Sequence, residues 1–267
     1  MFKETGDPQE ALRTRDVMMP ALLVLAQADR IGAEGVTSAQ VEQALESALP
    51  LSSMDREKQE GRSSRFSRTV RNTIVSHQTL EKQGLARRLR ASEANPLVRL
   101  RITAKGQSLL CDHMLDMLSE SLPTLESLAA SEPTPRVVEG AARMGEAELV
   151  NLAVLVLALA QKANEDRPVG TTLLRRAIKT RLQVSPEDAQ VLAGRRDTKI
   201  DQILRNLLGS HDALTRFRFA TRNEEGLAIT AKGKAHLLNT VLLASVPAPP
   251  SIRSAAPSAA GARRPRP

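Results

Sequence analysis

Apolar residues recur along the chain at helical spacing, and in two places they are followed by short stretches in which they alternate with charged residues. Near the N-terminus, Leu22 and Leu25 lie on one face of a helix expected over 17–29. A second helix is expected to begin with Ser38 as its N-cap. It should end before Pro50, because proline lacks a backbone donor and disrupts a helix interior. The opening of the chain therefore predicts two amphipathic helices.

A longer third helix is expected over 65–83, preceded by a short helical turn that starts at Ser53. Gly84 would end this helix, since glycine readily adopts the left-handed conformation found at helix C-termini. The segment 98–102 alternates apolar residues with arginine, which is the period of a half-buried strand, and 85–90 is its expected hairpin partner. Helices followed by a β-hairpin are typical of a winged helix-turn-helix domain.

The same pattern occurs a second time. The sequence Ile-Thr-Ala-Lys-Gly at 102–106 recurs unchanged at 229–233, an offset of 127 residues, and the Arg-Asn…Ser-His segment at 71–77 is echoed at 205–211, an offset of 134. A second hairpin strand is expected where phenylalanine alternates with arginine at 216–219. Landmarks that keep their order at nearly constant spacing indicate an internal duplication.

The predicted fold class is mainly α (α+β), with two tandem winged helix-turn-helix domains joined by a long helix and a proline-containing linker. We expect domain 1 at 14–108, the connecting helix and linker at 109–145, domain 2 at 146–240 and a disordered basic tail at 246–267. The connecting helix is part of a longer helix expected over 104–128, which carries a stripe of apolar residues along one face. Packing within the chain and a homodimer seam are the two alternatives for that stripe.

Charge is unevenly distributed along the chain. Among 267 residues, 38 Lys and Arg face 30 Asp and Glu, a formal net charge of +8. Residues 61–101 alone hold ten basic and two acidic residues, so the remainder is much less basic. This pattern favours a polyanionic partner such as nucleic acid. With no Trp, no Tyr and four Phe, the chain has few rings for the base stacking on which single-strand binders depend.

Other features argue against several protein classes. Cys111, the single cysteine, cannot form an intramolecular disulfide, and with His113 it supplies too few ligands for zinc. Residues 1–15 lack the apolar core of a signal peptide, and the longest apolar stretch, 152–160, is far shorter than the ~20 residues of a membrane span. Phosphate-binding, dinucleotide and nucleophile-elbow motifs are missing. Helix capping explains the acidic residues at 186–188 better than nuclease chemistry does. We therefore expect a cytoplasmic, nucleoid-associated protein without enzymatic activity, cofactor, metal or membrane association.

Several motifs of the first copy resemble the N-terminal winged-helix domain of Mrr-type restriction proteins. The stretches that carry the resemblance are Asp16-Val-Met-Met-Pro20-Ala-Leu22-Leu-Val-Leu25-Ala26, Gly61-Arg62, Leu80-Glu-Lys-Gln-Gly84-Leu85 and Arg101-Ile-Thr-Ala-Lys-Gly106. The second copy is less similar, since Val154 replaces the early proline, and Val75 stands where the family often has Trp. The resemblance implies double-stranded DNA binding, without the nuclease domain of the Mrr-type enzymes.

The solvent face of the third helix is basic in both copies. A helical wheel at about 100° per residue places Phe66, Val70 and His77 on the packed face, and His211 holds the equivalent place in the second copy. Both histidines are therefore interpreted as core residues. Arginine reads guanine, and Asn or Gln reads adenine, in the major groove. The residues expected to meet DNA from these helices are Arg65, Arg68, Arg71, Asn72, Lys199, Gln202, Arg205 and Asn206. The hairpin residues expected at phosphates or in the minor groove are Arg88, Arg90, Arg99, Arg101, Arg216 and Arg218.

A charged helix face is usually only solvated, but here the same face is basic twice at the same place in the fold. The sequence therefore predicts a sequence-selective double-stranded DNA-binding protein, a transcriptional regulator whose two copies read two half-sites. The alternatives are a non-catalytic DNA-organising or partition protein, or a defence-complex assembly protein that uses winged helices for protein contacts. A third alternative is a specificity subunit that recruits a separate nuclease.

Overall fold

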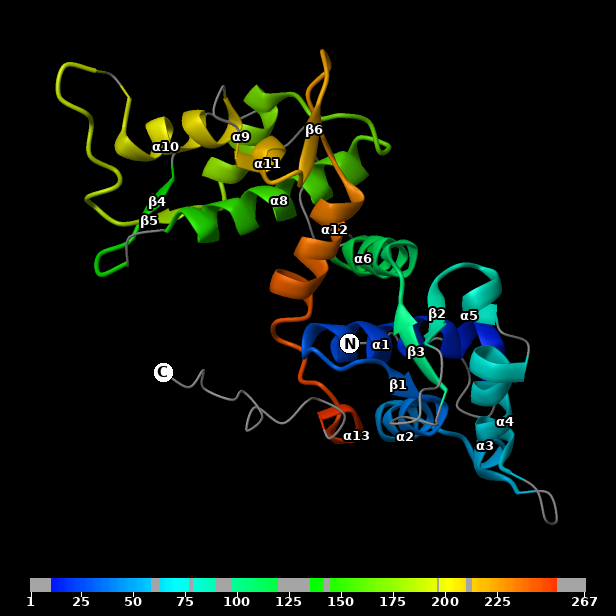
Figure 1. Ribbon diagram of the computed structural model, residues 1–267. Coiled ribbons are helices and arrows are strands. Elements are labelled where there is room, and N and C mark those ends of the chain that lie inside the picture. The colour runs from blue at the N-terminus through cyan, green and yellow to red at the C-terminus, as the bar shows by residue number, and fades with distance from the viewer. Residues whose placement is uncertain are drawn as a thin grey trace, which may run out of the picture. The chain divides into compact units, whose positions relative to one another are not determined.

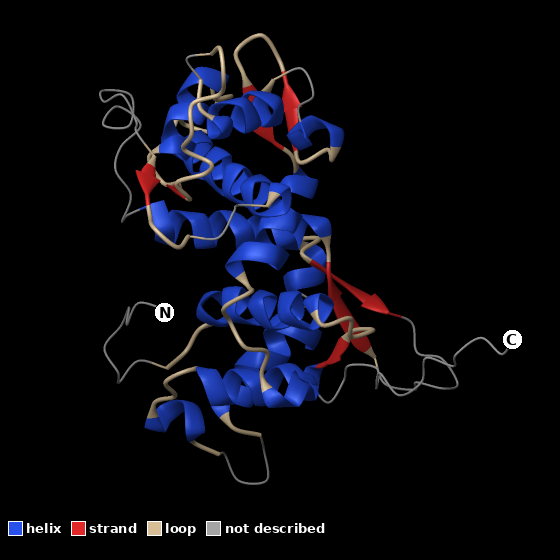
Figure 2. Cartoon of the chain, turned by 90° about the vertical axis from the view of Figure 1, so that its left-hand side faces the viewer, coloured by secondary structure: helices blue, strands red, loops and turns tan. Residues whose placement is uncertain are grey.

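Residues 11–58, 63–76, 79–89, 98–119, 135–141, 145–195, 197–209 and 213–253 are described in the computed structural model of the chain (Figure 1). The structure is helix-rich with small sheets, which confirms the expected mainly α (α+β) class (Figure 2). Two compact units make up the chain. Unit 1 comprises residues 1–110 and 245–267, and unit 2 comprises residues 111–244.

Unit 1 consists, in its described residues, of helices packed around a small antiparallel sheet. Its helices are α1 (Thr14–Arg30), α2 (Ser38–Ala48), α3 (Ser53–Arg56), α4 (Arg65–Arg71), the π-helix η1 (Asn72–Ser76), α5 (Thr79–Lys82), the start of α6 (Ala104–Ser119) and α13 (Pro250–Arg253). Its strands are β1 (Val36–Thr37), β2 (Ala86–Leu89) and β3 (Arg99–Ile102). The strand order is β1-β3-β2, with antiparallel pairing throughout.

Unit 2 follows a related order of elements. Its helices are the rest of α6, α8 (Glu146–Ala163), α9 (Thr171–Lys179), α10 (Lys199–Leu208), α11 (Ala213–Arg216), α12 (Ala231–Leu237) and the π-helix η2 (Leu238–Leu242). Its strands are β4 (Arg136–Val137), β5 (Gln183–Val184), β6 (Ala220–Arg222) and β7 (Leu227–Ile229). Strands β6 and β7 form an antiparallel hairpin, whereas β4 and β5 pair in parallel.

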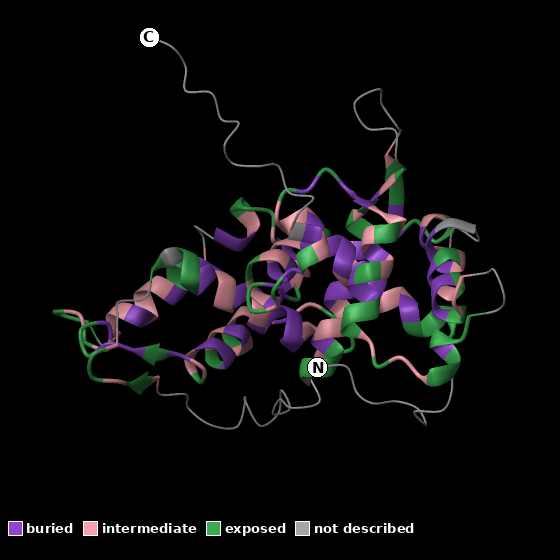
Figure 3. Ribbon diagram, turned by 90° about the horizontal axis from the view of Figure 1, so that it is seen from below, coloured by how far each residue is buried: buried purple, intermediate pink, exposed green. Residues whose placement is uncertain are grey.

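The helices begin and end close to where the residue pattern predicts. The first expected helix is α1, in which Leu22 and Leu25 are buried. Helix α2 is capped by Thr37, one residue before the expected Ser38, because the Thr37 hydroxyl accepts the backbone N–H of Gln40. Gly84 has a φ of +70°, as expected of a helix-terminating glycine. In Figure 3, buried positions run as stripes along helices whose opposite sides are exposed, which is the arrangement that helical periodicity predicts.

The repeated Ile-Thr-Ala-Lys-Gly sequence has the same role in both units. In unit 1, the Thr103 hydroxyl donates to the Gly84 carbonyl at 2.6 Å, and in unit 2 the Thr230 hydroxyl donates to the Arg218 carbonyl at 2.6 Å. Each threonine hydroxyl also accepts the N–H of the glycine three residues later, which caps the helix that follows. One threonine therefore ties the end of the hairpin, the turn before β2 or β6, and the next helix together.

The glycine of the same sequence permits close approach of two backbones. A Cβ at Gly106 would lie 2.2 Å from the carbonyl oxygen of Leu85, and a Cβ at Gly233 would lie 2.1 Å from that of Phe219. No side chain fits at either position without moving the backbone. This physical constraint accounts for the recurrence of glycine after the threonine.

The short turn before the third helix is also duplicated. Ser52 donates to the carboxylate of Asp55 at 2.8 Å and begins α3. Ser185 donates to the carboxylate of Asp188 at 2.9 Å, and both aspartates are buried. Residues 186–189 form a turn rather than the short helix expected there, so helix capping does not account for the acidic residues at 186–188. Asp188 instead closes the turn: its carboxylate accepts the Ser185 hydroxyl, which in turn accepts the Asp188 N–H.

The third helix of unit 1 is not the regular helix expected over 65–83. Regular α-helix ends at Arg71, η1 winds as a π-helix over 72–76, and α5 resumes at Thr79. A π-helix has more residues per turn than an α-helix, so a wheel at 100° per residue loses its phase beyond Arg71. His77, and the equivalent His211, lie outside the described residues.

The expected strands also need two corrections. Leu100 and Ile102 are buried as predicted, but Val98 lies before β3 and is 51 % exposed. In unit 2 the strand begins at Ala220, so the expected alternation at 216–219 does not form a strand. Arg216 ends α11 instead, and residues 217–219 form the turn and bend that lead into β6.

The connecting helix is described as far as Ser119, and the remainder of the expected stripe over 104–128 lies outside the described residues. Leu110 and Leu115 are buried, whereas Met117 and Leu118 are exposed. The stripe is therefore only partly covered within the described chain.

The expected disordered tail at 246–267 is wrong for residues 246–253. This segment belongs to unit 1, where α13 contacts α1 and α2 (Figure 1). Ile252 is completely buried and Ala248 nearly so, which gives this Pro- and Ser-rich segment apolar anchors. The side-chain amide of Gln40 donates to the Ser251 carbonyl at 3.4 Å. Residues 254–267 lie outside the described residues.

Truncation of the buried anchor should weaken unit 1. Ile252→Ala removes a fully buried side chain and is expected to lower the free energy of unfolding by about 2–5 kcal/mol, measured by urea denaturation followed by circular dichroism. Val98→Ala is the control, because an exposed valine should change stability by no more than about 0.5 kcal/mol. Equal stability of Ile252→Ala and the native protein would contradict the packing of α13.

Candidate nucleic-acid interface

Helix α4 has one buried, apolar side and one exposed, basic side. Phe66 and Val70 are buried, and the Ser64 hydroxyl caps the helix by accepting the N–H of Ser67 at 3.1 Å. Its exposed basic residues are Arg65, Arg68 and Arg71. The arrangement expected from the wheel is therefore present over the α-helical part of the third helix.

Asn72 differs from the expectation. It is the first residue of η1 and is half-buried, so its amide is less accessible than a regular helix would make it. The side chain of Val75, the position where a tryptophan is often found in the resembled family, lies outside the described residues. The basic surface of unit 1 therefore depends on α4 itself.

Helix α10 occupies the equivalent place in unit 2. The Lys199 N–H at its start donates to the Gln190 carbonyl, as the Arg65 N–H at the start of α4 donates to that of Glu57. Arg205 is exposed on α10. The other expected contacts comprise exposed Asn206 and half-buried Lys199 and Gln202.

Acidic neighbours partly neutralise the basic face of α10. Lys199 Nζ lies 3.2 Å from a carboxylate oxygen of Asp188. Arg205 forms an ion pair with Asp197, and the hydrogen bond from the guanidinium to that carboxylate raises the pKa of Arg205. Any anion that binds Arg205 has to compete with Asp197.

An ion pair fixes α10 against α9. Lys179 Nζ lies 2.6 Å from the carboxylate of Asp201, which also accepts the hydroxyl of Thr198 at 2.7 Å. Partial burial alone would raise the pKa of Asp201, but the hydrogen bonds from Lys179 and Thr198 outweigh it and lower the pKa below its ordinary value. This carboxylate thus stabilises the helix pair while it is ionised.

Three described arginines of the unit 1 hairpin form ion pairs with aspartate and glutamate side chains of the same unit. Arg101 Nε lies 2.6 Å from Asp29 on α1, and Arg88 Nε lies 2.6 Å from Glu81 on α5. Arg99 is 3.7 Å from Glu34. Arg90 lies outside the described residues. These ion pairs hold the hairpin to the helices and reduce its excess positive charge.

The register of the hairpin corrects the expected orientation of Arg88. Arg88 pairs with Leu100 across the strands, so it shares the face of the sheet that carries buried Leu100. Arg87, which is not among the residues expected from the sequence to meet DNA, is exposed and pairs with Arg101 on the other face. Neighbouring residues in a strand point to opposite faces of the sheet. Because Ala86 is buried, its neighbour Arg87 must point to the solvent face, and this alternation is the feature that could have identified Arg87 as an exposed arginine.

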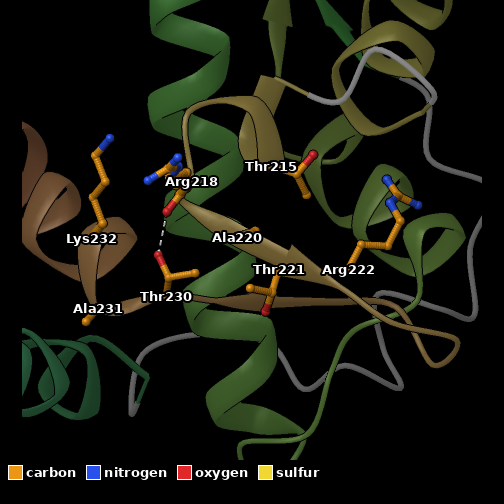
Figure 4. A pocket seen from close by; sticks show the side chains of 8 residues that line it. All are labelled: Thr215, Arg218, Ala220, Thr221, Arg222, Thr230, Ala231 and Lys232. Atoms are coloured by element: carbon orange, nitrogen blue, oxygen red, sulfur yellow. Dashed lines mark hydrogen bonds between the residues drawn. The ribbon is translucent and has the colours of Figure 1, made fainter.

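The unit 2 residues Arg216 and Arg218 are exposed but do not lie on a strand. Arg216 ends α11, and its guanidinium carbon lies 4.9 Å from the ring centroid of Phe217. Arg218 has a φ of +61° in the turn before β6. Arg222 is the arginine on the strand, and it donates to the Leu208 carbonyl at the end of α10 at 2.6 Å. Arg222 (Figure 4) is not among the residues expected from the sequence to meet DNA, although Arg88 is its counterpart 134 residues earlier.

Other chemistry is limited in the residues that the structure describes. Burial, and to a smaller extent the charge of Asp112, raise the pKa of the Cys111 thiol to about 12. No group of three or more His, Cys, Asp or Glu in the described ranges is arranged to hold a metal ion. Among the described helices, none combines the length and apolar character needed to cross a membrane.

Comparisons of the chain with protein-family models, with curated proteins and with solved structures find no match. The resemblance to the winged-helix domain of Mrr-type restriction proteins therefore stays a prediction carried by the motifs quoted above.

The ion pair between α9 and α10 makes a pH-dependent prediction. Asp201→Asn is expected to lower the thermal unfolding temperature at pH 7, because the carboxylate held by Lys179 is removed. The folded-state pKa lies below the unfolded value of about 3.9, so this stabilisation is present above about pH 4 and is lost as pH falls through the folded-state pKa. The difference between variant and native protein should therefore shrink below pH 4.

The control is Glu165→Gln, which removes an exposed carboxylate paired with exposed Arg167. It should change the unfolding temperature little at either pH, because exposed ion pairs contribute little. A difference for Asp201→Asn that stayed constant down to pH 2 would contradict the electrostatic role of Asp201.

Proposed function

We propose that the chain is a sequence-selective double-stranded DNA-binding protein that acts as a transcriptional regulator. Its two units would be winged helix-turn-helix domains, with α4 and α10 as the recognition helices in the major groove. In such a domain the helix that reads the groove follows a positioning helix and precedes a β-hairpin. Helices α2 and α9 and the two hairpins have these relative positions in the chain order.

The strand arrangement supports this proposal. In unit 1, Val36 of β1 pairs with Leu100 of β3, and the order β1-β3-β2 makes β3 of the hairpin the central strand of the sheet and β2 an edge strand. In unit 2, Val169 and Leu227 are at the positions equivalent to Val36 and Leu100, and they form an isolated antiparallel bridge instead of a strand pair. Each hairpin is thus paired, through its second strand, with an earlier extended segment of the same unit.

The single observation that carries the proposal is the duplicated basic helix face. Arg71 and Arg205 are 134 residues apart in the sequence and are both exposed, each followed by asparagine. They lie on helices whose first residues make equivalent backbone hydrogen bonds. Arginine can form bidentate hydrogen bonds with guanine, and each such contact contributes about 1–3 kcal/mol of discrimination.

The hairpins support a smaller role in recognition. Arg88, Arg99 and Arg101 bind acidic side chains of unit 1, so ion pairs would have to break before they could bind phosphates. The arginines of α4 are exposed on the helix that would enter the groove, so we take them as the candidates for contact with bases in unit 1. The absence of stacking rings from the exposed sides of α4 and α10 also fits a duplex, whose bases are read at their edges.

The test begins with selection of the preferred duplex from a random pool. The double variant Arg71→Ala/Arg205→Ala should then bind this duplex more weakly, by about 1–3 kcal/mol for each base contact that is removed, with relaxed preference at the contacted base pairs. Affinity is measured at one fixed salt concentration, because phosphate contacts make it salt-dependent.

The matched control is Arg15→Ala/Arg167→Ala, which removes one exposed arginine from each unit outside α4 and α10. This control should keep the sequence preference. Unchanged affinity of Arg71→Ala/Arg205→Ala would contradict the assignment of the recognition helices. Selection that enriches no sequence would contradict sequence-selective binding and favour the DNA-organising alternative.

Release of Arg205 from its acidic partner should have the opposite effect. Asp197→Asn removes the carboxylate that competes with DNA for the Arg205 guanidinium, so affinity for the selected duplex should increase. The same substitution in the Arg205→Ala background should give a smaller gain, since no guanidinium is left to release. Equal gains in both backgrounds would mean that Asp197 acts only through general repulsion of phosphate.

A further inference from the structure

Residues 246–252, which we call the C-terminal strap, lie against α1 and α2 of unit 1 (Figure 1). Three of these seven residues are prolines, at positions 247, 249 and 250. Proline has no backbone N–H and a fixed φ, so a segment rich in proline is stiff and offers carbonyl acceptors but few donors. A surface that binds such a segment has to supply the donors itself.

Helix α1 supplies two side-chain donors to the backbone of the C-terminal strap. Gln27 Nε2 donates to the Pro247 carbonyl at 3.3 Å. Arg30 Nη2 donates to the Val246 carbonyl at 3.3 Å. Because Gln27 is only 3 % exposed, loss of the Pro247 carbonyl would cost its amide a hydrogen bond that water replaces poorly.

Helix α2 supplies a third donor, whose direction is set by the cap of the helix. Gln40 Oε1 accepts the backbone N–H of Thr37 at 3.0 Å and the Thr37 hydroxyl at 3.1 Å, as part of the capping box of α2. The other end of the amide, Nε2, is thereby directed to the Ser251 carbonyl, to which it donates at 3.4 Å. The Ser251 hydroxyl donates back to the Gln40 carbonyl at 3.5 Å.

Apolar anchors complete the contact. Ile252 is completely buried and Ala248 is nearly so. The three donors of α1 and α2 bind backbone carbonyls, which every residue has. The contacts therefore select an extended proline-rich backbone with one branched aliphatic anchor, rather than this particular sequence. Recognition of a stiff, preformed proline-rich segment is a recurring mode of peptide binding.

Unit 2 does not offer these glutamine donors at the equivalent positions. Gln161, 134 residues after Gln27, donates to the Asp166 carbonyl of its own unit. Leu173 is the third residue of α9, whereas Gln40 is the third residue of α2. The donors are therefore a feature of unit 1 and not of the duplicated fold.

We propose that Gln27, Arg30 and Gln40 form a binding site for an extended proline-rich segment of a partner protein, with the C-terminal strap as its resident, displaceable ligand. This site goes beyond DNA binding and does not depend on it. Ala244 and Ser245, which precede the strap, are exposed turn residues, so the strap can leave without unwinding a helix before it. Its short tether gives the strap a millimolar effective concentration, against which a partner segment has to compete.

The experiment uses the full chain with a specific protease site inserted between Ala244 and Ser245, so that the protein folds around its own strap before cleavage. The probe is a fluorescent peptide of residues 245–253, Ser-Val-Pro-Ala-Pro-Pro-Ser-Ile-Arg. After cleavage and dialysis, the peptide should replace the resident segment and bind, as measured by fluorescence anisotropy. The uncleaved chain should bind it at least about tenfold more weakly, because the tethered strap competes.

Gln40→Glu tests the third donor without removing the cap. Glutamate keeps the oxygen that accepts Thr37 but replaces Nε2 with a carboxylate oxygen beside the Ser251 carbonyl, so the affinity of the cleaved chain for the peptide should fall about tenfold. Gln43→Glu is the matched control, because it makes the same change at an exposed position of α2 and should leave the affinity unchanged. A peptide with alanine in place of its three prolines should bind more weakly, because it is less extended when free.

Three results would overturn the proposal. A cleaved segment that stays bound without exchanging, or a cleaved chain that unfolds once the segment is removed, would make the C-terminal strap a permanent part of the fold. Equal affinity of Gln40→Glu and Gln43→Glu would contradict the role of the donor. A native protein that elutes as a dimer and becomes monomeric on cleavage would show that a second copy, and not a partner protein, supplies the segment.

Discussion

The threonine at the base of each hairpin is the interaction on which the rest of each unit depends. Thr103 and Thr230 each donate to the carbonyl of the turn residue before the hairpin and accept an N–H from the helix after it. The glycine three residues later lets the two backbones meet at a distance that excludes a Cβ. The turn before the hairpin, the end of the hairpin and the following helix are thereby held in one arrangement in both units.

Ion pairs hold three described arginines of the unit 1 hairpin. Arg88, Arg99 and Arg101 bind carboxylates of unit 1 and stabilise the attachment of its hairpin. Those of α4 project from a helix whose other side is buried, and they are exposed to solvent. A basic composition therefore overstates how much positive charge a hairpin offers to nucleic acid, since desolvating and separating each ion pair opposes binding.

The two units have diverged at the same structural position. Gly84 and Arg218 both accept the threonine hydrogen bond with positive φ, although only glycine adopts that conformation without a steric penalty. In unit 1 the glycine avoids this penalty, and in unit 2 the arginine adds an exposed cation at the turn before the hairpin. Equivalent turns thus carry different surface chemistry in the two units.

The sequence by itself determined the duplication, the main helices, the pairing of the first hairpin and the basic side of α4, because these follow from local periodicity and spacing. The tertiary structure alone decided the partner of each charge: Arg101 binds Asp29, 72 residues away, and Arg205 binds Asp197. It also decided the π-helix after Arg71 and the burial of Ile252 in unit 1. The partner of Arg101 and the burial of Ile252 depend on which distant segments meet, and the period of a single segment carries no information about its partner.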